Sequence, residues 1–516
     1  MLTVKQRAMK KIAKTTLILL LTLGIGISCT KNFEEMNTSP NSPTDVPAIN
    51  TFTGVCVSSP TNWLGGWIQH TYLGCWSQQW TKIQYIDEDK YLVRPSDMDG
   101  FFNTTYTTSL KNLQIVLDKT ADFATTSTDF RDDGLHAAAM VLVAWNYSML
   151  TDVFGDVPYF HAIEGFSATG DLTPVYDPQE QIYKSLIDTL LPKANEILAG
   201  SIENFGAGDV IYGGDPAKWR KFCNSLRLRL LNRASDAWAD ADTKIHDMLG
   251  NPTKWPIMAS NDDNCKLDFP GAAPYKNPIY NTLFSRTDQG ISQTAVDFMK
   301  KRSDPRLPVF AQPRAEDGDY VGQQNGAARQ PPMAKRSLLG TAIAYTANAP
   351  VIILQYAEVK FYIAEHMARK SENAKAEYEE AIKASMDLWG VGSAADAYLA
   401  GENVAYSQSK AIELITEQKW MAIFGQGVEA YAEIRRTHTP KRIFEYELEA
   451  TVFPGRGLPV RMGYSTAEQS YNGKNLIAAK DRQGVENTDG GMFGARVWWD
   501  TKMQPIPTVK DPQKDY

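Results

Sequence analysis

The chain has 516 residues, a net charge of −7 and a pI near 5.6. Its content of 43% hydrophobic and 22% charged residues is typical of a globular protein, and its acidic balance argues against nucleic-acid binding, which needs a basic surface. The length allows a large hydrophobic core. After residue 29 we expect no segment that spans a bilayer.

The first residues indicate export. Five basic residues precede a short apolar run, Leu17 to Ile27, which ends at Ser28-Cys29. A run of this length is typical of a signal peptide, because a membrane-spanning helix needs about 20 apolar residues. A cysteine placed directly behind small residues is typical of a bacterial lipoprotein processing site. We therefore predict a signal peptide over 1–28 and lipidation of Cys29; the alternative is an ordinary signal peptide in which Cys29 is incidental.

The next segment differs in composition from the rest. Residues 30–48 are polar and contain Pro40, Pro43 and Pro47, which is typical of an extended linker. We predict a flexible tether over 29–48 and a single α-helical body over 49–516.

Helical spacing dominates the first half of the body. We expect Trp63, Trp67 and Trp76 to lie in the core, an amphipathic helix over 101–118, and a fully buried helix over 135–150. Asp177-Pro178 and Asp215-Pro216 each place an N-cap acceptor before a proline, which predicts two helix starts.

The second half alternates between loops and helix pairs. Residues 260–350 contain nine prolines and predict a long irregular excursion with one short helix at 291–301. A helix pair follows over 352–386, in which Ala374, Tyr378 and Ala381 match half of a tetratricopeptide pattern. Another hairpin is predicted over 409–437, broken at residues 425–427. The pattern as a whole predicts a mainly α fold.

Catalytic and metal-binding patterns are not found in the sequence. The six histidines are scattered without metal-ligand spacing, and no nucleophile-elbow, Walker or dinucleotide motif occurs. We therefore predict no enzyme activity, no metal and no cofactor, although carboxylate pairs and a calcium ion at a loop stay open. We expect Cys56, Cys75 and Cys223 to be buried small hydrophobes, and the disulfide state of these and Cys265 stays open.

Ligand binding has better support in the composition. Aromatic residues make up 11% of the chain, with 12 tryptophans, and flat aromatic rings stack on sugar rings while amides and arginines hydrogen-bond hydroxyl groups. Two loop regions, 80–106 and 270–345, combine these residue types, and loops on a rigid scaffold suit binding. The candidate ligand-binding residues are Trp80, Tyr85, Tyr91, Phe101, Asn103, Tyr275, Tyr320, Arg329 and Tyr345.

Seven segments, in order along the chain, carry a family resemblance. They are Asn32 to Glu35 after the lipoprotein start, Gly155 to Tyr159 (GDVPY), Trp219 to Leu226 (WRKFCNSL), Asp304 to Leu307 (DPRL), Tyr356 to Val359 with Ala364-Glu365, Tyr431 to Thr437, and Leu458 to Arg461 with Tyr464, Glu468 and Asn472. In these segments the chain resembles the SusD/RagB family of nutrient-binding outer-membrane lipoproteins of Bacteroidota.

The resemblance implies both a fold and a function. It implies tetratricopeptide-like helix pairs that form a right-handed superhelical scaffold, with loop-rich insertions carrying the binding face, and Arg435, Arg436 and Asn224 tying loops to that scaffold. It also implies a lipid-anchored protein at the cell surface that captures an oligosaccharide and hands it to a SusC-like TonB-dependent transporter of the outer membrane. The alternatives are a peptide-binding importer subunit, a tethered helical scaffold that binds only protein, and a surface hydrolase. Phe101 or Phe102 stands where a tryptophan would suit sugar stacking better, which argues against starch-like helical glycans.

Overall fold

The computed structural model describes residues 46–121, 131–166, 170–200, 203–507 and 509–510, with isolated positions 3, 6, 9 and 13 before them. The chain divides into two compact units, Met1–Pro47 and Ala48–Tyr516, of which the second is described below. Cys29 and nearly all of the predicted signal peptide and tether lie outside the described residues, so these assignments stay predictions.

The first half of the second unit is almost entirely helical. Its helices are α3 Ala48–Pro60, the π-helical turns η1 Thr61–Gly65 and η2 Gln69–Leu73, α4 Gly74–Trp76, α5 Pro95–Thr104, η4 Thr105–Leu110, α6 Lys111–Lys119, α7 Arg131–Phe154, α8 Gln179–Ser185, η7 Leu186–Leu190, α9 Leu191–Leu198, α10 Pro216–Ala234 and α11 Ala241–Gly250.

The second half holds the short strands and the remaining helices. In chain order, its elements are β2 Cys265–Leu267, α12 Pro278–Leu283, β3 Gln289–Ile291, α13 Gln293–Lys301, α14 Leu307–Phe310, α15 Thr341–Ala344, β4 Val351–Leu354, α16 Tyr356–Arg369, α17 Lys375–Leu388, α18 Ala395–Leu399, α19 Ala411–Ala422, α20 Gly427–Thr437, α21 Arg442–Glu445, β5 Tyr446–Glu447, α22 Thr466–Tyr471, α23 Gly473–Gln483 and β6 Val509–Lys510. The strands form two-stranded pairs, β1 (Trp80–Lys82) with β3, β2 with β4, and β5 with β6.

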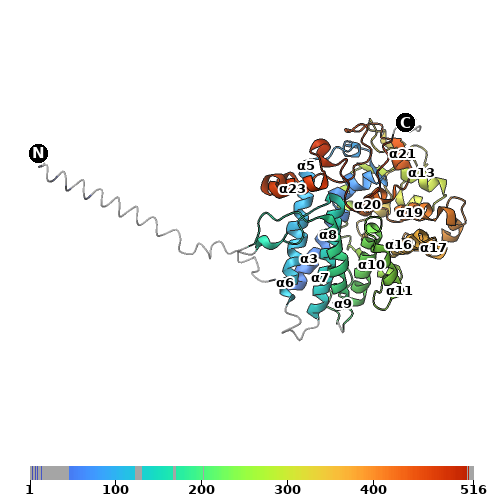
Figure 1. Ribbon diagram of the computed structural model, residues 1–516. Coiled ribbons are helices and arrows are strands. Elements are labelled where there is room, and N and C mark those ends of the chain that lie inside the picture. The colour runs from blue at the N-terminus through green and yellow to red at the C-terminus, as the bar shows by residue number, and fades with distance from the viewer. Residues whose placement is uncertain are drawn as a thin grey trace. The chain divides into compact units, whose positions relative to one another are not determined.

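The helices pack as a continuous series in which each contacts the next. Figure 1 shows α3, α6 and α7 beside α8, α9 and α10, with α16, α17, α19 and α20 following. A second hydrophobic cluster fills the space between α16, α17, α18 and α19, and Ala374, Tyr378 and Ala381 are fully buried in it. The predicted tetratricopeptide-like pair is therefore confirmed, as is the mainly α fold.

The helix α7 lies at the centre of the first half. It is long and apolar enough to cross a membrane, contrary to the expectation that no segment after residue 29 would be. However, 94% of its apolar window is buried inside the protein, and Trp145 and Leu150 are fully buried. The prediction of a buried helix is confirmed, and α7 acts as a core helix of this unit.

Both predicted helix starts are confirmed, since α8 begins at Gln179 and α10 at Pro216, but only one of the two predicted caps forms. Asp215 caps α10 as predicted, because its carboxylate accepts hydrogen bonds from the backbone N–H groups of Ala217 and Lys218 at 2.9 and 3.2 Å. The capping role predicted for Asp177 is wrong. The Asp177 carboxylate accepts from the N–H groups of Tyr159 and Phe160, and Asp156 takes the N–H of Gln179 at the start of α8 instead.

All four cysteines in the described residues, Cys56, Cys75, Cys223 and Cys265, are free and buried. Burial raises the pKa of each thiol, so they pack as small hydrophobic groups.

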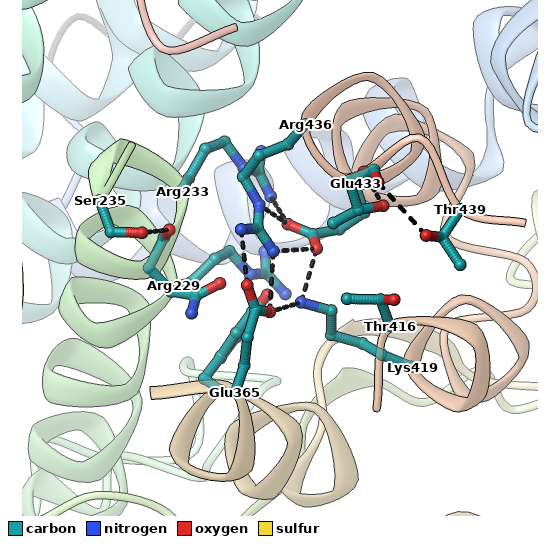
Figure 2. A network of polar contacts seen from close by, with 12 residues as sticks. Arg229, Arg233, Ser235, Glu365, Thr416, Lys419, Glu433, Arg436 and Thr439 are labelled. Carbon is teal, nitrogen blue, oxygen red and sulfur yellow. Dashed lines mark hydrogen bonds and ion pairs between the residues drawn. The ribbon is translucent and has the colours of Figure 1, made fainter. Parts of the chain in front are cut away.

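A buried ionic network joins α10, α16, α19 and α20 (Figure 2). Arg436 donates to Glu365 and to Glu433 at 2.7 and 2.8 Å, and Lys419 bridges the same two carboxylates at 2.8 and 2.5 Å. Next to this group, Arg233 pairs with Glu429 and with Asp152 of α7. Since the pairs are fully desolvated and span these four helices and α7, we infer that they fix the relative positions of those helices.

The residues that the family resemblance assigned to the scaffold do hold it together, but in different ways. Arg435 donates to the backbone carbonyls of Val460 and Asp152, both at 2.8 Å, and Asn224 donates to the carbonyl of Pro256 at 2.9 Å. Both side chains therefore tie loops to helices. Arg436 instead joins the ionic network.

Candidate functional site

The short ladder between β1 and β3 brings the two predicted loop regions together. Trp80 pairs with Ile291, Thr81 with Gly290 and Lys82 with Gln289. Beyond the strands, the N–H groups of Ile83 and Gln84 both donate to the carbonyl of Asp288, at 2.7 and 3.2 Å. Residues 83–85 and 286–288 are therefore held side by side.

A buried amide strengthens this junction. The side chain of Asn325 donates to the carbonyls of Cys75 and Trp80 and to Asp89, at 3.0, 2.8 and 2.8 Å. The other oxygen of Asp89 accepts from Thr81 Oγ1 at 2.7 Å. Burial raises the pKa of Asp89 to about 6, although these hydrogen bonds oppose the rise. The loops are thus fixed by the core beneath them, which is the arrangement that preorganises a binding surface.

Tyr85 stands exposed on this rigid base. Its side chain is 60% exposed, and its backbone has φ = +53°, a left-handed conformation that is strained for a tyrosine. Strain of this kind is concentrated at functional sites. A large aromatic ring that is both exposed and held in a strained conformation is therefore a strong candidate for ligand contact.

Arg286 contacts two aromatic residues, Tyr85 and Tyr345. Its guanidinium lies 5.7 Å from the centroid of the Tyr85 ring, it pairs with Asp288, and its carbonyl accepts a hydrogen bond from the Tyr345 hydroxyl at 3.5 Å. Burial raises the pKa of Tyr345 to about 12, so its hydroxyl stays protonated. We call Tyr85, Phe284, Arg286 and Tyr345 the aromatic face.

Phe284 directly follows α12 and lies two residues before Arg286. It is largely exposed and stacks on Tyr280 with ring centroids 5.3 Å apart. Apolar rings with an adjacent guanidinium match the faces and hydroxyl groups of a sugar, because the rings contact C–H groups while the guanidinium donates to hydroxyl oxygens.

The predicted ligand residues divide into three groups. Tyr85 and Tyr345 are brought together through Arg286. Tyr275 is 64% exposed in the same excursion, and Asn277 ties that segment to the carbonyls of Ala347 and Ala349. These three residues remain candidates for ligand contact.

Three of the predicted ligand residues are buried, which corrects the expectation of direct contact. Trp80 is fully buried because β1 pairs with β3 and its ring enters the main core. Tyr91 packs edge-on against Trp76, and Phe101 packs edge-on against Trp63 at 4.4 Å between ring centroids. The packing of the strand and the helices places all three rings in the core.

The other three predicted residues lie apart from the aromatic face. Asn103 is exposed on α5 and Arg329 is exposed in the loop before α15. Tyr320 is half-buried and follows Asp319, which pairs with Lys300. Among the described residues, no hydrogen bond, ion pair or ring contact joins any of these three to the aromatic face.

Sequence reasoning missed Arg286 and Phe284 and misplaced Trp67. Trp67 was predicted to lie in the core but is 37% exposed. It follows the end of η1 at Gly65-Gly66, and this break in the helix moves its side chain out of the buried stripe. The glycine pair was a visible signal for that departure. The core positions predicted for Trp63 and Trp76 are confirmed.

His70 lies buried beneath the same region, where its backbone carbonyl accepts from Gln289 at 3.1 Å. Burial, and then Lys82 and Arg286, lower its pKa to about 3. A depressed folded-state pKa contributes stability that is present above pH 6.5 and is lost as the pH falls. We expect His70 to lower the free energy of unfolding by about 2 kcal/mol between pH 6.5 and pH 5.

Chemical denaturation at the two pH values measures this effect, and the variant His70→Gln serves as the comparison. The raised pKa of Asp89 acts in the opposite sense, so the quantity to measure is the difference between wild type and variant. Parallel pH dependences of the two proteins would contradict the assignment of His70 as a buried neutral group.

No cluster of three or more histidine, cysteine or acidic side chains that could hold a metal ion occurs among the described residues.

Residues 40–465 match the SusD-like family described as starch-binding and associated with the outer membrane. The chain belongs to the SusD-like family. The match covers most of its length and includes both loop regions that form the aromatic face. No curated protein matches the chain.

Solved structures share the fold of this SusD-like protein. It is similar to a chitin-binding protein, with 25% identity and a TM-score of 0.73 over 88% of this chain and 99% of the other. It is also similar to a chitin-binding SusD homolog from Flavobacterium johnsoniae, with 24% identity and a TM-score of 0.71 over 88% and 98%. A SusD homolog from Bacteroides fragilis has 23% identity and a TM-score of 0.73 over 89% and 100%.

Proposed function

We propose that this SusD-like protein captures an oligomeric nutrient, a glycan, at the cell surface and delivers it to a SusC-like TonB-dependent transporter. In this proposal the lipidated Cys29 anchors the protein in the outer membrane, and the segment 29–48 lets the body move as a lid over the barrel. The protein binds its ligand without chemical turnover.

The aromatic face is the observation that carries the proposal. Tyr85, Arg286 and Tyr345 come from two distant segments and meet on a base fixed by the β1–β3 ladder and by Asn325. Backbone strain at residues other than glycine is concentrated at functional sites, and Tyr85 combines such strain with an exposed ring. Stacking on sugar rings is the role that suits a tyrosine beside a guanidinium.

In the proposed lid mechanism, ligand binding is coupled to closure of the body over the barrel. A ligand closes a lid only if it contacts the closed state more favourably than the open state. A long oligomer can satisfy this condition because it touches the aromatic face at one end and the transporter at the other. The family's association with the outer membrane supports this placement.

The choice of a glycan rests on the chemistry of the face and on the neighbours. The family description names starch, and two similar structures are described as chitin-binding. A peptide would favour a longer groove lined with backbone donors and acceptors.

Titration calorimetry of the purified protein against neutral oligosaccharides and mixed-sequence peptides tests the ligand class. We expect saturable heat with at least one oligosaccharide and recovery of that oligosaccharide unchanged after prolonged incubation. Binding of peptides alone would favour the peptide importer, and shortened oligosaccharide products would show a hydrolase.

A further inference from the structure

A cavity of about 40 Å³ lies between the loop regions and the helical scaffold. On one side it is lined by Trp80 of β1 and by residues of α12 and α15, the segments that lead to the aromatic face. On the other side it is lined by Trp389, which directly follows α17, and by Phe424 and Gln426, which lie between α19 and α20. We call this space the Trp80 cavity.

Four buried polar atoms on three of these lining residues have no hydrogen-bond partner among the described residues. They are Trp80 Nε1, Trp389 Nε1, and both Nε2 and Oε1 of Gln426. Trp80 is fully buried and Gln426 is 3% exposed. Because both ends of the Gln426 amide are unpaired, turning the amide over does not satisfy it. Each of the four atoms therefore costs free energy unless a molecule in the cavity pairs with it.

The scaffold side of the Trp80 cavity is firmly held. Phe424 stacks on Phe310 with ring centroids 4.3 Å apart and an interplanar angle of 4°. Trp389 packs edge-on against the same Phe310 ring at 5.1 Å, and the backbone carbonyl of Gln426 accepts from the N–H of Ala430 at 2.8 Å. Close-packed rings and a hydrogen-bonded backbone resist collapse of the cavity around the unpaired atoms.

The four atoms define the chemistry of the occupant. Three are N–H donors and one is a carbonyl acceptor, so the occupant must both accept and donate hydrogen bonds. Among the described residues, none that lines the cavity is ionisable, which disfavours an ion because nothing there compensates its charge. An apolar molecule would leave all four atoms unpaired.

Water meets these requirements. Each water molecule both donates and accepts, and the volume of the Trp80 cavity holds about three of them. Pro350, which also lines the cavity, is exposed to solvent, so water can enter from the surface.

We infer that the Trp80 cavity is an internal hydration site, in which ordered waters bridge Trp80 of β1 to Trp389 and Gln426 of the scaffold. The waters complete the support of the strand that leads to Tyr85. This inference concerns the base of the aromatic face and not ligand contact, so it is independent of the proposed function.

The test uses the full-length protein in two measurements. In a high-resolution crystal structure of wild type, we expect about three waters in the cavity, within hydrogen-bond distance of Trp80 Nε1 and the Gln426 amide. In solution, oxygen-17 magnetic relaxation dispersion counts long-lived waters, and we expect fewer of them in Gln426→Met than in wild type. A dry cavity, or one that holds an ion or an organic molecule, overturns the inference.

The stability of Gln426→Met provides a second test, because methionine keeps the length of the side chain and removes both polar ends. If waters pair with the amide, their hydrogen bonds are lost and the urea midpoint falls. If no water pairs with it, removal of an unpaired buried amide leaves the midpoint unchanged or raises it, which overturns the inference. A lower midpoint with an unchanged number of long-lived waters also overturns it. If Gln426→Met does not fold, the electron density of wild type decides alone.

Discussion

Replacing Tyr85 with alanine is expected to weaken oligosaccharide binding at the aromatic face by about thirtyfold, or about 2 kcal/mol. The Tyr85 ring is 60% exposed and is held by a rigid backbone. The Arg286 guanidinium lies over this ring. Loss of the ring removes the stacking surface and leaves the guanidinium without its aromatic neighbour. Titration calorimetry against the bound oligosaccharide measures the change.

The backbone of Tyr85 provides an independent check on this prediction. Glycine adopts φ = +53° without strain, so Tyr85→Gly is expected to raise the free energy of unfolding by up to about 1 kcal/mol while weakening binding at the face as much as Tyr85→Ala does. Tyr471 is 81% exposed on α22 and makes a matched control. Equal losses of affinity in Tyr85→Ala and Tyr471→Ala would contradict the assignment of the face.

Replacing Lys419 with methionine is expected to lower the free energy of unfolding by about 3–5 kcal/mol. Lys419 bridges Glu365 and Glu433 inside the ionic network (Figure 2). Methionine fills similar space but leaves two buried carboxylates with less compensation. Urea denaturation measures the loss, and Lys441→Met is the control, because the exposed pair of Lys441 with Glu413 is expected to contribute less than about 1 kcal/mol.

The network also predicts a response to acid. Burial alone would raise the pKa of Glu433, but Arg436, Lys419 and Arg233 together lower it to about 2. A depressed carboxylate pKa contributes stability that is present above pH 4.5 and is lost as the pH falls towards 2. Wild type is therefore expected to lose stability over that range more steeply than Lys419→Met. Similar stability of Lys419→Met and Lys441→Met at neutral pH would contradict a structural role for the network.

The helices were predictable because their signals are local. The spacing around α7 and the Asp215 cap of α10 depend on neighbours within a few residues, and the Ala374, Tyr378 and Ala381 stripe repeats with the period of a helix. The Asp177 prediction failed because a distant partner, the turn at 159–160, competed for the same carboxylate. The local pattern alone contains no information about that competitor.

The site was predictable only in outline. The two loop regions were identified by composition, but their meeting depends on the β1–β3 ladder between residues about 200 positions apart. Trp80 lies within the ladder and is buried, whereas Tyr85 lies beyond the ladder and is exposed. Arg286 was missed because one arginine in a long loop has no distinguishing pattern until its neighbours in space are known.

Isolation of the protein from intact outer membranes, with a tag after Tyr516, tests the central claim most directly. Mass spectrometry would identify the proteins and small molecules that co-purify in mild detergent. We predict a large TonB-dependent barrel and a bound oligosaccharide, and we predict that the oligosaccharide is lost from Tyr85→Ala while the barrel is retained. A protein that purifies alone, or only with soluble surface proteins, would contradict the proposed role as the binding subunit of a transporter.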